Sequence, residues 1–155
     1  MAVFTRTVTI DRPADKVFTF IEDPANVPKW LEGVVSIEPL TEGPMRAGWK
    51  FKETRMIGKR ESSTVIEVRE HEGPRQGKQP PYRHRAGATM MGVDAVYDFT
   101  FHAIDGARTR VDVIAEVKAI NMFGKLVAGI AAKAMEKHDS DMLDRLKRSL
   151  EKAMG

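Results

Sequence analysis

The sequence predicts an α+β fold in which a seven-stranded antiparallel sheet curves around a long C-terminal helix, with two short helices after the first strand. Three observations predict this fold. Residues 3–10 alternate apolar and polar side chains with the period of two that is typical of a half-buried strand. Six further strand-like segments follow, separated by turn signals. Residues 123–153 then change to helical spacing, with an apolar side chain every three or four positions.

The N-terminal elements are a strand and two short helices. The strand at 3–10 is rich in β-branched residues, with its threonines on one side. Pro13 suits the first turn of a helix, so a short helix should follow it directly. Pro24 ends this helix, a second turn or helix finishes near Trp30, and Gly33 turns the chain into the next strand.

The six central segments predict an antiparallel meander. They lie near residues 34–42, 47–57, 60–72, 82–91, 94–104 and 108–119. Turns that contain glycine or proline connect them, including Gly58 and Asp105-Gly106. The alternation is clearest in the last two segments, so one face of the sheet should pack inward while the other contacts water.

The C-terminal segment predicts one helix of about 30 residues, roughly 45 Å long at a rise of about 1.5 Å per residue. A helix of this length suits a position diagonally across a strongly bent sheet, where it closes the concave face. The chain has 155 residues and contains neither an internal repeat nor a linker, which indicates a single domain over 1–155.

The composition excludes several classes of function. Lys and Arg total 25 and Asp and Glu total 22, and this small excess does not indicate a nucleic-acid partner. The absence of cysteine excludes disulfides, thiolate metal sites and a cysteine nucleophile. The N-terminus lacks the pattern of a secretory signal, and no run approaches ~18 apolar residues. We therefore expect a cytoplasmic protein without stable membrane insertion, as a monomer or homodimer.

The motifs of metal and cofactor sites are also absent. His71, His84, His102 and His138 show neither His-x-x-x-His nor Glu-x-x-His spacing, so no metal is expected. The sequence has no Gly-x-Gly-x-x-Gly motif, Walker loop or Gly-x-Ser-x-Gly motif. No cofactor is expected, and neither nucleotide-dependent chemistry nor serine hydrolysis is supported.

Several motifs resemble the START/polyketide cyclase superfamily, also called SRPBCC, which has the helix-grip fold. They are VTIDRPADKVF at 8–18, DPAN at 23–26, PKW at 28–30, DGARTRV at 105–111 and LDRLKRSLE at 143–151. The resemblance implies a hydrophobic cavity between the sheet and the long helix. It also implies relatives that carry lipids, sterols, quinones or plant hormones, cyclise or dehydrate polyketides, or bind chaperones. These motifs serve packing and turns, so they leave the branch open.

Polar residues on the inward side of strands are the candidate site residues, because a ligand pocket combines apolar walls with a few placed polar groups. Glu53 and Arg55 lie at the same alternate positions of the strand as Trp49 and Phe51, so all four side chains should point inward. Glu53 and Arg55 would then pair and orient a polar ligand head. The alternative is that a bulge reverses this parity and leaves both charges on the surface.

Tyr82 and His84 share the inward side of another segment, and Tyr97 is a candidate on the same terms. A neutral imidazole and a phenol in a cavity would hydrogen-bond a carbonyl or transfer protons in an aldol cyclisation or dehydration. The alternative is that they line the mouth without chemistry. His138 lies on the apolar stripe of the helix, where it either caps a ligand's polar end or is a satisfied core residue.

The predicted ligand-binding residues combine inward strand positions with the helix stripe. They are Trp49, Phe51, Met90, Phe99, Phe101, Val127, Ile130, Ala134 and His138. The first interpretation is binding or transport of a hydrophobic small molecule, such as a lipid, a quinone or a polyketide-like compound. The second is a polyketide cyclase/dehydrase-type enzyme that uses the polar candidates. The third is a protein-interaction module with Val3, Met45 or Met56 exposed and no functional cavity.

Overall fold

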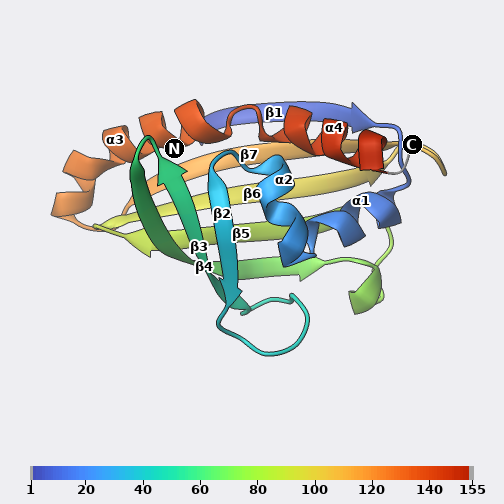
Figure 1. Ribbon diagram of the computed structural model, residues 1–155, viewed down its shortest axis with the longest axis horizontal. Coiled ribbons are helices and arrows are strands. Elements are labelled where there is room, and N and C mark those ends of the chain that lie inside the picture. The colour runs from blue at the N-terminus through green and yellow to red at the C-terminus, as the bar shows by residue number, and fades with distance from the viewer. Residues whose placement is uncertain (1, 154–155) are drawn as a thin grey trace.

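The computed structural model describes residues 2–153 and consists of one curved sheet with helices on one face (Figure 1). The strands are β1 (Ala2–Ile10), β2 (Val34–Pro39), β3 (Lys50–Ile57), β4 (Arg60–Glu72), β5 (Tyr82–Met90), β6 (Val93–Ala103) and β7 (Thr109–Ala119). The helices are α1 (Ala14–Ile21), α2 (Val27–Trp30), α3 (Met122–Asp139) and α4 (Met142–Ala153), with short 3₁₀ turns η1 (Pro24–Asn26) and η2 (Pro74–Gln76).

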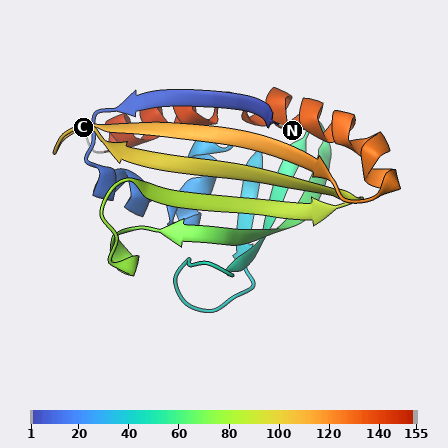
Figure 2. The same cartoon turned by 180° about the vertical axis from the view of Figure 1, so that it is seen from behind.

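The strands form one antiparallel sheet in the order β1-β7-β6-β5-β4-β3-β2. The predicted α+β class with seven strands is therefore confirmed. None of the described helices lies over the opposite face of the sheet (Figure 2). The inner face therefore packs against the helices while the outer face contacts solvent, as the period-two alternation predicts.

The main core lies between the inner face of the sheet and the helices α1 and α4. Phe18 of α1 and Leu146 of α4 are fully buried against Phe101 and Val111 from the sheet. The rings of Phe18 and Phe101 meet edge to face, with centroids 5.3 Å apart. Each such side chain contributes roughly 1.5–3 kcal/mol by leaving water, so this end of the molecule is the firmly packed one.

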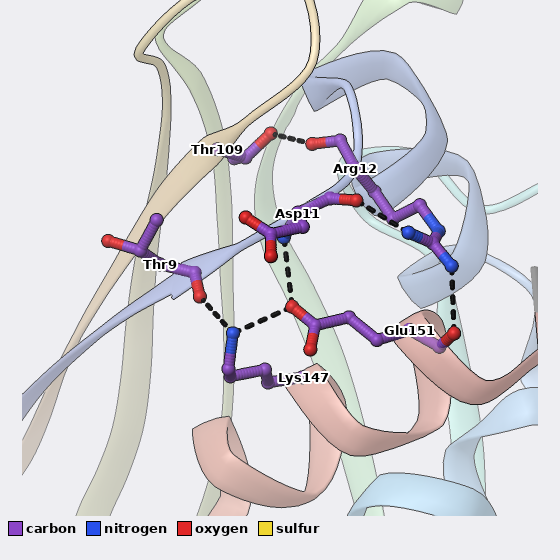
Figure 3. Close-up of polar contacts among 6 residues, drawn as sticks. All are labelled: Thr9, Asp11, Arg12, Thr109, Lys147 and Glu151. Atoms are coloured by element: carbon purple, nitrogen blue, oxygen red, sulfur yellow. Dashed lines mark hydrogen bonds and ion pairs between the residues drawn. The ribbon is translucent and has the colours of Figure 1, made fainter. Parts of the chain in front are cut away.

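Polar contacts attach the end of α4 to the end of β1 (Figure 3). The Asp11 backbone N–H donates to the Glu151 carboxylate at 2.9 Å, and the Arg12 guanidinium donates to the Glu151 carbonyl at 2.7 Å. The Lys147 ammonium donates to the Thr9 carbonyl at 2.7 Å. These bonds satisfy groups at a strand end and a helix end, and they fix the position of α4 on the core.

The C-terminal helix consists of two segments, whereas the sequence pattern predicts one uninterrupted helix over 123–153. A turn at Ser140 and Asp141 separates α3 from α4. Both residue types favour helix ends because their side chains compete for backbone hydrogen bonds. The Asp141 carbonyl accepts the Arg145 N–H at 3.1 Å, so the hydrogen bonds of α4 begin there. The two helices follow one another along the sheet beside β1 (Figure 1).

Small residues of helix α3 face the sheet, whereas the sequence pattern predicts that Val127 and Ile130 do. A Cβ on Gly124 would lie 1.7 Å from the Gly92 carbonyl oxygen, so only glycine permits this approach. Asp139, at the other end of α3, is buried. The close approach of Gly124 to Gly92 and the burial of Asp139 set the rotation of the helix. This rotation leaves Ile130 70% exposed and Val127 partly exposed. Neither lines the cavity, contrary to their predicted positions.

Substitution of Asn121 by alanine should destabilise the protein by about 1 kcal/mol, because the Asn121 side chain caps the first turn of α3. Its amide oxygen accepts the Gly124 N–H at 2.8 Å. Urea unfolding gives the free energy, and hydrogen exchange should be faster in the first turn of α3. Asn121→Ser keeps an acceptor and serves as the control. Equal losses in the serine and alanine variants would contradict a capping role.

Candidate functional site

A cavity of about 270 Å³ lies between the inner face of the sheet and the helices α2, α3 and α4. Its apolar wall includes Ile21, Val27, Trp30, Leu31, Met45, Phe51, Ile66, Met90, Phe99, Met135 and Met142. Ligand pockets commonly have volumes of about 300–1,000 Å³, so the volume of this cavity is slightly below that range. Met45, expected at the surface in the protein-interaction interpretation, is buried in this wall.

Small side chains on the sheet create the space for the cavity. Ala86 and Ala88 of β5 and Ala95 of β6 all face it, and Ala88 pairs directly with Ala95. Side chains at alternate positions of neighbouring strands share one face. The short side chains of these alanines therefore leave space above this part of the sheet. Phe51 and Phe99, which have larger side chains, also line the cavity.

The predicted ligand-binding residues divide into two groups by position. Phe51, Met90, Phe99, Ala134 and His138 line the cavity. Trp49 and Phe101 do not, and Val127 and Ile130 lie outside it as described above. Trp49 packs with Met45, Phe51 and Val68, and its indole N–H donates to the Gly43 carbonyl at 3.1 Å. Phe101 is fully buried beneath α1. Contact with a ligand stays a prediction for the residues that line the cavity.

Glu53 and Arg55 face the cavity, as their parity predicts. The β3–β4 register is continuous, with Glu53 opposite Thr64 and Arg55 opposite Ser62. The alternative of a bulge that moves both charges to the surface is therefore wrong. Both side chains lie in the cavity wall, and the exposed fractions of their side chains are 7% and 15%.

An ionic network joins these strand residues to α3. The Arg55 guanidinium donates to the Glu53 carboxylate at 3.1 Å and to the Asp139 carboxylate at 2.7 Å. The Tyr97 hydroxyl donates to the second oxygen of Asp139. Burial raises the pKa of Glu53, although the Arg55 charge opposes this shift. Burial and the Asp139 charge raise the pKa of Tyr97, so its hydroxyl keeps its proton at neutral pH.

Asp139 is a site residue that the sequence analysis does not identify. The only signal for it is a stripe of small residues and methionine at Gly124, Ala128, Ala131 and Met135, whose spacing continues to Asp139. That stripe predicts a buried face of the helix, but it does not show that an aspartate there would meet Arg55. The contact spans 84 positions of the chain and exists only in the folded protein.

His84 faces the cavity from β5, and its ring contacts a second buried histidine. The Nδ1 atoms of His84 and His71 lie 2.9 Å apart, and His71 Nε2 lies 2.9 Å from a Glu22 carboxylate oxygen. Burial, together with the neighbouring His71, lowers the pKa of His84 to about 3. His84 is therefore a neutral imidazole at physiological pH.

Neither His71 nor Glu22 is among the site residues that the sequence predicts. The β4–β5 register shifts between Val68 and Glu70, which inserts one extra residue into β4. This bulge turns both Val68 and His71 to the inner face, although their spacing of three breaks a period-two alternation. A pattern based on alternation therefore places His71 on the wrong side of the sheet.

Tyr82 shares the inner face with His84 but not the cavity. Its ring packs against Phe18 in the core beneath α1, with centroids 5.3 Å apart, and its hydroxyl donates to Asp15. It does not line the cavity. A joint action of Tyr82 and His84 on one ligand is thus not supported, whereas Tyr97, Glu53 and Arg55 do meet in one cavity through Asp139.

The described residues form neither a metal cluster nor a membrane-spanning helix. Among residues 2–153, no group of three or more His, Asp or Glu side chains is arranged to hold a metal ion. No helix within the described part of the chain is long and apolar enough to cross a membrane. The cavity combines an apolar wall with the Arg55 network and the neutral imidazole of His84.

Comparisons with known proteins agree with this architecture. A family model described as polyketide cyclase/dehydrase and lipid transport matches residues 1–151. The structure of Zhui aromatase/cyclase from Streptomyces sp. R1128 is similar with a TM-score of 0.72 at 15% identity, covering 98% of this chain and 94% of that chain. A START superfamily protein from Mycobacterium smegmatis is similar with a TM-score of 0.65 at 13% identity, covering 97% of each chain.

The di-domain ARO/CYC protein BexL from the BE-7585A biosynthetic pathway is similar with a TM-score of 0.71 at 14% identity. The similarity covers 96% of this chain and 46% of BexL, so the chain spans about half the length of that protein. A search among curated proteins found no match. At these levels of identity, the similar structures support the fold alone.

Proposed function

Because the chain belongs to the polyketide cyclase/dehydrase and lipid transport family, we propose that it binds a small, largely apolar molecule that carries a carbonyl or hydroxyl group. The observation that carries this proposal is the 270 Å³ cavity, whose apolar wall contains the buried network of Glu53, Arg55 and Asp139. The apolar wall favours rings or short chains through the hydrophobic effect. The polar network orients the single polar group of the ligand.

The charges of the network favour a neutral ligand. Glu53 and Asp139 are two buried carboxylates, and Arg55 is the guanidinium that bonds to both. An anionic ligand would add another negative charge to a site where electrostatic interactions are stronger than in water. We therefore expect ketones, phenols or quinones to bind more tightly than carboxylates of the same size.

A matched pair of probes tests this proposal. We expect 2-naphthol to bind the purified protein in isothermal titration calorimetry, and 2-naphthoate to bind at least tenfold more weakly. The two probes share a ring system and differ in charge. Native mass spectrometry of the purified protein would also detect an apolar molecule that survives purification. Equal affinity for both probes would contradict the argument from charge, and no binding of 2-naphthol would contradict the proposal.

Filling the cavity should weaken binding without unfolding the protein. Ala88→Phe places an aromatic ring in the space above the alanines, so we expect 2-naphthol affinity to fall at least tenfold. Ala103→Phe is the matched control, since Ala103 is exposed at the end of β6 and does not line the cavity. Calorimetry gives the affinities and circular dichroism checks the fold. A ligand that binds outside the cavity would instead leave the affinity of the Ala88 variant unchanged.

A second candidate function is catalysis of proton transfer on the bound molecule, as in a cyclase or dehydrase. The observation that favours it is the neutral imidazole of His84 in the same cavity as Arg55 and Tyr97. An imidazole that faces a carbonyl compound acts as an acid or base, and a guanidinium stabilises negative charge that develops on oxygen. A protein-interaction role without a cavity has no such support.

A further inference from the structure

A chain of hydrogen bonds connects the cavity to a second hollow on the outside of the molecule. It consists of His84 on β5, His71 on β4 and Glu22 at the end of α1, with 2.9 Å between each pair of bonded atoms. The His71 side chain is completely buried, whereas Glu22 lies in the wall of an outer hollow of about 370 Å³. This chain lies outside the Arg55 network described above.

We propose that Glu22, His71 and His84 form a proton relay, which removes a proton from the carbon next to the carbonyl group of a ketone in the cavity and passes it to the surface. This inference rests on the proposed function, because it requires a ligand in the cavity. Its substrate class is an enolisable ketone small enough for that space. His84 is the catalytic residue in this proposal, and His71 and Glu22 act through it as positioning and proton-carrying residues.

The hydrogen-bond partners define which ring nitrogens carry protons. A carboxylate only accepts, so His71 donates to Glu22 through Nε2–H. The relay requires a neutral His71, whose Nδ1 then carries a lone pair that accepts the His84 Nδ1–H. This leaves the Nε2 lone pair of His84 free, and no described residue hydrogen-bonds to that nitrogen. Since His84 lines the cavity, the lone pair is available to a ligand.

The aromatic surroundings hold both rings in place. The Phe18 ring packs on His71 with centroids 4.8 Å apart, and the Phe99 ring packs near His84 at 6.0 Å. Arg75 is the charged residue that approaches the outer end, with its Nε 3.5 Å from Glu22 and a side chain that is 61% exposed. The neighbouring aromatic rings therefore restrict both imidazoles, and at the outer end the Glu22 side chain is 10% exposed in the wall of the outer hollow.

The proton transfer balances without any other reactant. The substrate carbon gives its proton to His84 Nε2, and the electron pair of the C–H bond stays on the substrate as an enolate. The Nδ1 proton of His84 passes to His71 Nδ1, and the Nε2 proton of His71 passes to Glu22. Glu22 becomes a neutral carboxylic acid and releases the proton to water in the outer hollow. The reverse sequence returns the same hydrogen from His84 Nε2 to the carbon. Exchange with solvent therefore occurs when the enolate leaves the cavity and takes a hydron from water. His84 Nε2 then loses its proton to water that enters the cavity, and Glu22 takes a proton from the outer hollow, which restores the starting tautomers.

The relay explains how a buried histidine can act as a base. An isolated His84 would hold an added proton poorly, because burial opposes its charged form. By passing its Nδ1 proton to His71, His84 remains neutral throughout the transfer. The enolate forms in the same cavity as Tyr97 and Arg55. In the β5–β6 pair, His84 lies opposite Phe99, and Tyr97 lies two residues before Phe99. Tyr97 is therefore a diagonal neighbour of His84 on the same face of the sheet.

The first test measures deuterium exchange of 2-tetralone, a bicyclic ketone, in D₂O by proton NMR. We expect the saturated wild-type protein to accelerate loss of the C1 proton signal, and His84→Asn to remove the acceleration. Glu22→Gln should reduce the rate roughly tenfold or more with the affinity unchanged. Glu72→Gln is the matched control on the outer side of β4 and should retain the wild-type rate. Acceleration unaffected by Glu22→Gln would overturn the relay.

His71→Asn separates proton transfer from support of His84. The asparagine amide oxygen can accept the His84 Nδ1–H in place of the imidazole nitrogen, but it cannot pass a proton to Glu22. We therefore expect slow deuterium exchange of 2-tetralone in this variant, while His84 keeps its proton on Nδ1. A wild-type exchange rate in His71→Asn would show that His71 only supports the ring.

The second test needs no ligand, so it distinguishes failure of the relay from failure of the proposed function. Histidine labelled with ¹⁵N should show His84 protonated at Nδ1 and His71 at Nε2 in the free protein at pH 7. The opposite tautomers would overturn the relay, whatever the ligand. Calorimetric binding of 2-tetralone without accelerated exchange would also overturn it while leaving the binding function intact. Absence of binding together with the expected tautomers would count against the binding function alone.

Discussion

Substitution of Arg55 by methionine should lower the free energy of unfolding by about 3–5 kcal/mol at pH 7.5, because it leaves two buried carboxylates without their cation. Arg55 contacts Glu53 at 3.1 Å and Asp139 at 2.7 Å, and the three side chains are between 6% and 15% exposed. Methionine fills a similar volume, so the loss arises from uncompensated charge rather than from a void. Urea unfolding at fixed pH measures this difference.

The loss in Arg55→Met should become smaller as the pH falls. Burial raises the pKa of Glu53, and without the opposing Arg55 charge this rise is larger, so the folded state takes up a proton more readily than the unfolded state. The cost of the buried charges is therefore present at high pH and disappears as the pH falls through the folded pKa. A variant that also carries Glu53→Gln and Asp139→Asn should recover most of the stability at pH 7.5. If this triple variant is as unstable as Arg55→Met, uncompensated charge is not the cause.

His84 should make the wild-type protein lose stability in acid. The pKa of His84 is about 3 in the folded protein against 6.5 for an ordinary histidine, so below pH 6.5 the unfolded state binds a proton that the folded state does not. The free energy of unfolding is unaffected by this group above pH 6.5 and decreases because of it as the pH falls from 6.5 toward 3. Between pH 7.5 and pH 5 the loss is about 2 kcal/mol from this group.

The comparison with His84→Asn isolates this effect. The raised pKa of Glu53 acts in the opposite direction, because protonation of that carboxyl favours the folded state as the pH falls. Both proteins contain Glu53, so its contribution cancels in the difference between their unfolding free energies. We expect this difference to decrease by about 2 kcal/mol from pH 7.5 to pH 5. A difference that stays constant with pH would show that His84 titrates normally in the folded protein.

These two predictions concern different parts of one cavity. The Arg55 network joins β3 and β6 to α3, and the His84 chain joins β5 and β4 to the end of α1. Variants in one network are expected to leave the other intact, since they share no hydrogen bond among the described residues. Ligand binding and proton transfer can therefore be examined separately.

The sequence by itself determined the fold class and the strands. Its alternation indicated an inward direction for His84 and Tyr97, and for Glu53 and Arg55 it left the inward direction and the reversed one open. Alternation along a strand is a local property, because successive side chains point to opposite faces wherever the pairing is regular. The segments predicted near 47–57 and 82–91 correspond to β3 and β5 for this reason. The motifs that resemble the superfamily serve turns and packing, so they indicate the fold and not the ligand.

Only the tertiary structure decided how these residues are combined. A bulge in β4 turned His71 inward, and the contact of Gly124 with Gly92 rotated α3 so that Asp139 met Arg55 while Ile130 faced solvent. Tyr82 and Phe101 kept the predicted direction but lie beneath α1, where the core leaves no space for a ligand. Register shifts, helix rotation and the position of a cavity depend on contacts between distant segments, and local periodicity carries no information about them.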